Sequence, residues 1–386
     1  MGSFLGYRRA DGRVGVRNHV VVFNVAGEIG PLVRRLGEAA PGVVPVVHPH
    51  GYAQFPEDRE QTLRALAGNA ANPNVAAALF IGLGDERDFA EEAAERARAL
   101  GQRAAALTVR GEGGAGALFA RAVEWLKEAL AEAEGVPRVT ASTAELIVGL
   151  ECGGSDGWSG ITANPALGVA SDLIVADGGT VILSETTEAI GAEHILAARA
   201  VSKKVAEEFL ALIEAYETRM KAEGSDYRKG NPSPGNIRGG LTTLDEKSLG
   251  CIKKAGSTPL TEVIAYAERP TQKGFVFMDS PGYDVDSVTG MVAGGAQVVV
   301  FTTGRGSPTG SPIAPVIKVG TNSRLYERMP EHIDVNAGVI LDGKGTLASV
   351  GEEIYRVIHE TASGKKCASE RHGHAEFAIW RLAESV

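Results

Sequence analysis

The sequence predicts an α/β protein with two Rossmann-like lobes, each built on a parallel sheet. From His19 onward, short apolar runs alternate with longer amphipathic segments, a pattern typical of βαβ units. The apolar runs are continuous, as expected for strands that are covered on both faces of a sheet. Residues 134–137 (EGVP) interrupt the alternation. We therefore expect an N-terminal α/β domain at 1–137, serving dimerisation, and a C-terminal Rossmann variant at 138–386.

In the first lobe, every predicted strand is followed by a predicted helix. The predicted strands cover residues 19–25, 43–47, 75–81 and 103–109. The predicted helices cover residues 29–39, 58–66, 86–100 and 116–133. The run GEGGAG at 111–116 matches a dinucleotide fingerprint, but no acidic strand end follows at the required distance. We interpret it as a tight strand-to-helix turn.

The second lobe continues the alternation but contains one long irregular stretch. Strands are predicted at 145–150, 180–183, 274–278, 297–301 and 315–319, and helices at 163–176 and 191–223. Residues 224–258 show little periodicity. A loop of that length is either functional or a surface insertion, so it is either a lid over a substrate or a solvated segment.

Composition excludes several functional classes. The 386 residues carry a net charge of −9, which argues against binding to nucleic acids or anionic membranes. The three cysteines are widely spaced and form no zinc or disulfide pattern. Neither a secretory signal nor a membrane-spanning apolar run is visible. We expect a cytoplasmic protein.

Small, polar and charged residues follow five of the predicted strands in the second lobe. These runs are ECGGSD (151–156), SETTE (184–188), DSPG (279–282), TTGRG (302–306) and GTN (320–322). In open parallel sheets, ligands bind outside the carboxyl ends of the strands. The runs therefore predict an anion site there, with Arg305 as a clamp for a carboxylate. The alternative is that these are ordinary polar loops.

Candidate metal ligands also lie at predicted strand ends. His50 lies in a glycine-containing loop, Asp85 follows the strand at 75–81, and Glu185 and Glu188 follow the strand at 180–183. Each residue alone is most simply a solvated charge. Together with Cys152, their positions favour a carboxylate/His/Cys site.

Several longer motifs resemble the altronate/galactarate dehydratase family. The motifs are residues 6–18, 151–168 (ECGGSDGWSGITANPALG), 184–193, 231–236 (NPSPGN), 247–251 (KSLGC), 301–306 (FTTGRG) and 363–365. The resemblance covers nearly the whole chain. It implies dehydration of a sugar acid, a C-terminal Rossmann-like domain, and iron or another divalent ion. It extends to the related sulfolactate sulfo-lyases, which release sulfite instead of water.

Many family members also carry a small N-terminal SAF domain, whereas here the family's opening motif starts at Gly6. The resemblance therefore implies that a separate small SAF-domain subunit is a partner, alongside a homodimer. The family tends to have cysteines where this chain has Tyr52 and Asp85. Fe²⁺ remains the first expectation, while Mg²⁺, Mn²⁺ or Ca²⁺ would suit an oxygen-richer ligand set.

From the motifs and strand ends together we assign candidate site residues. The expected metal ligands are His50, Asp85, Cys152 and Glu185. The expected catalytic residues are Lys247, Lys253, Glu188 and Arg305, and which one is acid or base stays open. The expected substrate-binding residues are Gly153, Gly154, Ser155, Asp156, Asn164, Asn236, Thr303 and Lys318.

The expected function is a metal-dependent lyase that converts a hydroxy-acid substrate, a sugar acid or a smaller acid, to a 2-keto-3-deoxy acid. A divalent ion, loop N–H groups and Arg305 or Lys318 would stabilise the dianionic enolate. Two alternatives remain: the large subunit of a sulfolactate-type C–S lyase, and a hydroxy-acid-binding relative without catalytic activity.

Overall fold

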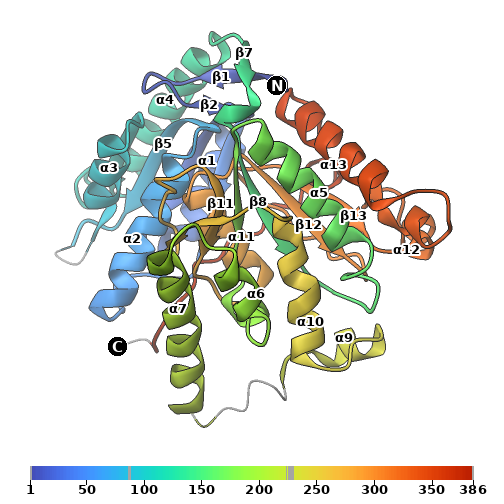
Figure 1. Ribbon diagram of the computed structural model, residues 1–386. Coiled ribbons are helices and arrows are strands. Elements are labelled where there is room, and N and C mark those ends of the chain that lie inside the picture. Colours follow the sequence, from blue (N-terminus) through green and yellow to red (C-terminus); the bar gives the residue numbers. More distant parts are fainter. Residues whose placement is uncertain (1, 86–87, 223, 225–229, 385–386) are drawn as a thin grey trace.

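The computed structural model describes residues 2–85, 88–222, 224 and 230–384. It confirms the predicted α/β class, because two parallel sheets are each flanked by helices (Figure 1). A small antiparallel sheet lies at one end of the molecule, and the helices α9 (Pro234–Arg238) and α10 (Leu244–Cys251) lie at the opposite end (Figure 1).

The first parallel sheet has the strand order β4-β3-β5-β6. Its strands are β3 (His19–Asn24), β4 (Val43–Val46), β5 (Val75–Gly82) and β6 (Ala104–Thr108). Its helices are α1 (Gly30–Ala39), α2 (Pro56–Ala70), α3 (Ala90–Ala99) and α4 (Ala115–Glu134). All eight match predicted elements, although residues 86–87 of the helix predicted at 86–100 lie outside the described residues. The GEGGAG run forms the predicted turn, with Gly113 and Gly114 at positive φ.

The second parallel sheet has the order β10-β11-β9-β8-β12-β13-β14. Its strands are β8 (Ile147–Cys152), β9 (Thr180–Leu183), β10 (Leu260–Ile264), β11 (Gly274–Met278), β12 (Val298–Thr303), β13 (Val316–Gly320) and β14 (Val335–Asn336). Its helices include α5 (Ala163–Ala176), α11 (Asp284–Ala293), α12 (Ser323–Arg328), α13 (Leu347–Ala362) and α14 (Ala368–Arg371). The sequence analysis missed β10, β14 and the last four of these helices.

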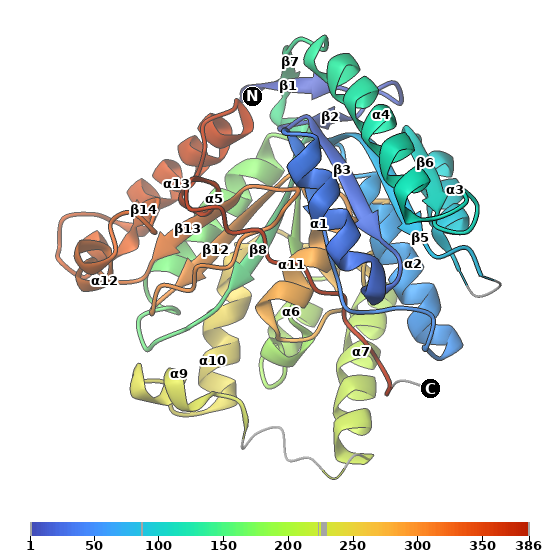
Figure 2. The ribbon, with the colours of Figure 1, turned by 180° about the vertical axis from the view of Figure 1, so that it is seen from behind.

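Both ends of the chain cross the predicted boundary between the lobes. Strand β1 (Ser3–Arg8) pairs with β2 (Val14–Gly15) and with β7 (Val139–Ser142). The C-terminal segment returns to the first lobe (Figure 2). There the Ile379 carbonyl accepts a hydrogen bond from His50, and the Asp58 carboxylate accepts one from the Leu382 N–H. The division at residues 137 and 138 stays a prediction.

The two parallel sheets share one apolar core. Residues from β3 and β5 pack in the same cluster as residues from β9, β11 and α11. Helix α2 meets α11 at Gly68, where a Cβ atom would lie 2.6 Å from the carbonyl oxygen of Ala293. Only glycine permits this approach, so the lobes are held in one relative position by packing.

Two sequence predictions in the second lobe are wrong. The helix predicted at 191–223 is two helices, α6 (Glu193–Ala198) and α7 (Lys203–Ala222). Between them, Ala200 forms a bridge to Leu260 at the start of β10. The segment 224–258 is not an irregular loop, because it contains α9, α10 and the 3-10 helix η4 (Ile252–Ala255). Residues 225–229 lie outside the described residues.

Across the described ranges, every helix falls short of the length and apolarity that crossing a bilayer requires.

Asn74 links the lobes through four backbone hydrogen bonds and is fully buried. Its Oδ1 accepts from the N–H groups of Val16 and Arg17, and its Nδ2 donates to the carbonyls of Gln297 and Ile313. We predict that Asn74→Ala lowers the free energy of unfolding by about 2–4 kcal/mol, because buried backbone groups lose their partners. Urea denaturation tests this. The exposed Gln272→Ala is the control, and an equal effect of both variants would contradict the prediction.

Candidate active site

The candidate site lies where the strand order of the second sheet reverses. From β8 the chain proceeds to β9 on one side, and β12 pairs with β8 on the other. The carboxyl ends of β8 and β12 therefore lie side by side, at Cys152 and Thr303. Such a switch point leaves room outside the sheet for a ligand. The sequence analysis expected a ligand at this edge.

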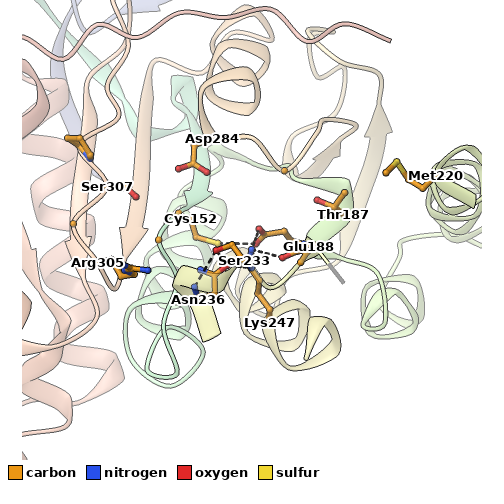
Figure 3. Close-up of a pocket in the computed structure, with 17 residues that line it drawn as sticks. Cys152, Thr187, Glu188, Met220, Ser233, Asn236, Lys247, Asp284, Arg305 and Ser307 are labelled. Atoms are coloured by element: carbon orange, nitrogen blue, oxygen red, sulfur yellow. Dashed lines mark hydrogen bonds and ion pairs between the residues drawn. The ribbon is translucent and has the colours of Figure 1, made fainter. Parts of the chain in front are cut away.

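A pocket of about 930 Å³ opens at this edge. Its lining includes Cys152, Glu188, Lys247, Asp284 and Arg305, which come from separate strand ends and from α10 and α11 (Figure 3). Gly153 and Gly154 also line it. A Cβ atom on Gly153 would lie 2.1 Å from Asp284 Oδ2, so glycine is needed to admit that carboxylate to the pocket.

Two lysine–carboxylate pairs lie in and beneath the pocket. Lys247 Nζ lies 2.5 Å from Glu188 Oε1 at the pocket wall. Lys254 Nζ lies 2.6 Å from Glu185 Oε2, and both of these side chains are completely buried. A fully buried ion pair is stable only when both charges are present, since removal of one leaves the other without compensation.

Two cysteines adjoin these ion pairs. Cys152 Sγ lies 3.6 Å from Cys251 Sγ and donates a hydrogen bond of 3.5 Å to Glu188 Oε2. Cys251 Sγ lies 4.0 Å from Glu185 Oε2. The hydrogen bond with Cys251, together with burial, raises the pKa of the Cys152 thiol well above its ordinary value. Both sulfurs therefore hold their protons in the arrangement shown.

The carboxyl groups of the site differ in how strongly they hold a proton. Burial raises the pKa of Glu188, but the positive charges of Lys247 and Lys254 outweigh burial and lower it overall. Burial and the Glu188 charge raise the pKa of Asp284 to about 6. The site therefore combines an ionised carboxylate with one that titrates near neutrality, a combination suited to proton transfer.

The backbone at Glu185 is strained. Its φ is 69°, in the left-handed region, which costs a non-glycine residue of order 1 kcal/mol. The conformation is held by a hydrogen bond from the Glu185 N–H to Ser280 Oγ at 2.8 Å. Strain of this kind persists where the surroundings fix it and occurs often at functional sites.

The donors around Glu185 fit a divalent metal ion. One ligand atom from each of Cys152, Glu185, Glu188 and Cys251 lies within 4.8 Å of the others. Glu185 Oε1 is buried and has no hydrogen-bond partner among the described residues, so it has unused capacity as a ligand. Two sulfurs beside carboxylates suit a soft or intermediate ion, and binding would displace the thiol protons.

The structure brings together only some of the predicted metal ligands. Cys152 and Glu185 belong to the four-residue cluster, whereas His50 and Asp85 are absent from every such group among the described residues. His50 lines a separate hollow with Glu28 and Tyr52 and bonds to the Ile379 carbonyl.

Of the predicted catalytic residues, Lys247, Glu188 and Arg305 line the pocket, but Lys253 does not. Lys253 is exposed on η4, and its neighbour Lys254 occupies the interior.

Several predicted substrate-binding residues hold the loops together, and their contact with a substrate stays a prediction. Asp156 accepts hydrogen bonds from Ser159, Thr321 and Asn322. Thr303 Oγ1 accepts from the N–H groups of residues 305, 306 and 307, so those groups are engaged internally.

Two asparagines among the predicted substrate-binding residues also form hydrogen bonds with backbone carbonyls of neighbouring segments. Asn164 donates to the Gly250 carbonyl. Asn236 lines the pocket and donates to the carbonyl of Ser155, which is itself buried.

Sequence reasoning missed Cys251, Lys254 and Asp284. A signal for two of them was present, because Lys247, Cys251 and Lys254 follow a spacing of four and three residues, which places them on one helical face. Treating 224–258 as a loop concealed that spacing. Asp284 carries no such signal, since it reaches the pocket only because α11 starts beside β8.

Lys318, another predicted substrate-binding residue, lies within β13 and is fully buried. Its Nζ lies 3.5 Å from the centre of the Phe301 ring and has no hydrogen-bond partner among the described residues. Burial lowers its pKa to about 7, against the attraction of Asp284. Lys318 does not line the pocket.

Comparison with known families identifies the family of this chain. The chain belongs to the D-galactarate/altronate dehydratase family. Residues 143–385 match the model described as D-galactarate/Altronate dehydratase, C-terminal. Residues 6–134 match the model described as D-galactarate dehydratase/Altronate hydrolase, second domain.

Among curated relatives, the (2R)-sulfolactate sulfo-lyase subunit beta of Chromohalobacter salexigens is 37% identical over 386 residues, covering 100% of this chain and 98% of that protein. The altronate dehydratase of Bacillus subtilis is also 37% identical, covering 98% of this chain and 78% of that protein. The galactarate dehydratase (L-threo-forming) of Escherichia coli is 44% identical over 64% of this chain and 47% of its own length.

We predict that Lys318→Met stabilises the protein. The unfolded lysine gains a proton as the pH falls through about 10, whereas the folded one stays neutral down to about 7. The native state of the wild type therefore loses stability as the pH falls from 10 to 7. The variant should gain at least about 1 kcal/mol at pH 7 and less at pH 10, by urea denaturation.

The exposed Lys344→Met is the matched control and should show no such pH dependence. A Lys318→Met variant that is no more stable than the wild type at any pH would contradict the prediction.

Proposed function

We propose that this protein is a lyase that dehydrates a sugar acid to a 2-keto-3-deoxy acid. The observation that carries the proposal is the pocket at the switch point, where the Glu188–Lys247 pair faces the same space as Asp284 and Arg305. An elimination of this kind needs a base, an acid and positive charge beside the substrate carboxylate. The similarity to altronate and galactarate dehydratases supports the reaction class.

In this proposal, Glu188 accepts the proton from the carbon next to the substrate carboxylate. A carbon–carbon double bond then forms as the bond to the neighbouring hydroxyl breaks. Lys247 donates a proton to that hydroxyl, which leaves as water, and the enol product tautomerises to the keto acid. The contact of 2.5 Å between Lys247 and Glu188 lets the abstracted proton return to the amine, so both residues regain their starting states.

Arg305 has a different role in this proposal. It lines the pocket and forms no ion pair with the described residues, so its guanidinium is available to bind the substrate carboxylate in a bidentate manner. The buried Glu185–Lys254 ion pair lies behind the reacting groups and holds the Glu185 carboxylate and the Lys254 ammonium group in place.

We propose that Cys152, Cys251 and Glu185 hold a divalent ion, and that Fe²⁺ is the favoured ion. When bound, it would supply Lewis-acid stabilisation of the charge that develops on the enolate. His50 and Asp85 lie outside this ligand group, and Cys251 supplies a second sulfur beside Cys152.

A second candidate is the large subunit of a C–S lyase that releases sulfite. The specific support is that the sulfo-lyase subunit beta matches this chain over nearly the full length of both proteins. Because that relative is named as a subunit, we propose that a small SAF-domain subunit completes the enzyme. We also propose that the large subunit forms a homodimer and that it acts in the cytoplasm.

A substrate screen tests the function. Purified protein, with and without the small subunit and with Fe²⁺, is incubated with aldonates, aldarates and sulfolactate. We predict keto-acid formation from a sugar acid and a kcat lower by roughly 10²–10⁴-fold in Glu188→Gln. Keto acid with sulfite would select the second candidate. Binding without turnover under every condition would indicate a non-catalytic relative and contradict the proposal.

We predict that Cys251→Ser weakens binding of the divalent ion by roughly 10-fold or more, because a sulfur ligand is lost. Elemental analysis of protein dialysed against limiting metal measures this. Cys367→Ser is the control, since Cys367 is also buried but bonds to Ser369 and Glu370 away from the cluster. Equal metal content in the two variants would exclude Cys251 as a ligand.

A further inference from the structure

A second hollow, of about 650 Å³, adjoins the reacting pocket. Four arginines line it, and we call it the arginine hollow: Arg238, Arg305, Arg324 and Arg328. They come from α9, the loop after β12, and α12. Arg305 lines both spaces. The two hollows are therefore neighbours that share one guanidinium group.

The four guanidinium groups share no hydrogen bond or ion pair with any described residue. All four side chains are exposed, and they differ from a single exposed arginine such as Arg34 in that they line one hollow together. Four like charges around one space repel each other, and a chain with net charge −9 has acids enough to pair them. Four guanidinium groups around one hollow, without a carboxylate partner among the described residues, form a site suited to an anion.

The carboxylate in the lining does not neutralise these arginines. Asp156 is 5% exposed, and its two oxygens accept hydrogen bonds from Trp158 N–H, Ser159, Thr321 and Asn322. Its lone pairs are directed into the surrounding loops. The positive charge of the hollow therefore remains available to a ligand.

The reacting pocket has far less free positive charge. Its Lys247 is engaged with Glu188, and Lys254 lies beneath it, engaged with Glu185. Among the described lining residues, that leaves Arg305 to meet one carboxylate. The other three arginines exceed what a substrate with a single acid group requires.

We propose that the arginine hollow is a second anion-binding site, which takes a carboxylate, sulfonate or phosphate group. Its favoured source is the far end of the substrate, so that the enzyme selects acids with a negative charge at both ends over acids with one. This source rests on the proposed lyase function. A free multivalent anion has the same chemistry and is the other source that the experiment distinguishes.

The test uses the double variant Arg324→Gln/Arg328→Gln in the full-length protein with its metal. Two six-carbon substrates are compared that differ only at the end remote from the reacting carbons: an aldarate, with a carboxylate, and the matching aldonate, with a hydroxymethyl group. We expect the ratio of kcat/KM for the aldarate to that for the aldonate to fall roughly 10- to 100-fold. The loss should appear mainly in KM.

Pyrophosphate binding by calorimetry distinguishes the second source and does not depend on turnover. A loss of pyrophosphate affinity in the double variant, with an unchanged substrate ratio, would assign the site to a free anion. The control is Arg34→Gln, which removes a charge from an exposed arginine on α1.

Identical substrate ratios and identical pyrophosphate affinities in the control and the double variant would overturn the proposal. Absence of turnover in the wild type would defeat the lyase function alone, because the calorimetry would still report on the hollow.

Discussion

The candidate site depends on one buried ion pair, between Lys254 and Glu185. Neither side chain reaches solvent, so each charge is tolerated only because the other is present. The pair fixes the Glu185 carboxylate beside Cys152 and Cys251, and it places positive charge behind Glu188. The Glu185 backbone at this position is left-handed, with φ of 69°, and the hydrogen bond to Ser280 holds it there. The groups that line the pocket, Glu188 and Lys247 among them, lie above this ion pair.

Above the ion pair, the topology of the sheet decides which groups meet. The carboxyl ends of β8 and β12 lie together because the strand order reverses between them. Glycines at 153 and 154 admit the Asp284 carboxylate and the loop around Arg305. The reacting pocket and the arginine hollow are thus two sides of the same loop, and Arg305 is the residue that belongs to both. A substrate with two acid groups would use both sides.

The loops that surround the site are held by their own side chains. Thr303 and Asp156 accept hydrogen bonds from backbone and side-chain groups of neighbouring segments. Polar residues at strand ends therefore divide into two groups, those that fix the loops and those that face the pocket. The family's motifs contain both, and sequence alone does not separate them.

The sequence by itself determined the α/β class, most strands of the two parallel sheets and the sheet edge where the pocket opens, because hydrophobic periodicity and polar strand ends are local signals. It also identified Cys152, Glu185, Glu188, Lys247 and Arg305 as site candidates. Only the tertiary structure decided that Lys254 rather than Lys253 is buried, since one residue of helical phase turns a side chain from solvent to core. It also placed His50 in a different hollow and Asp284 in the pocket, because those positions depend on how separate elements pack.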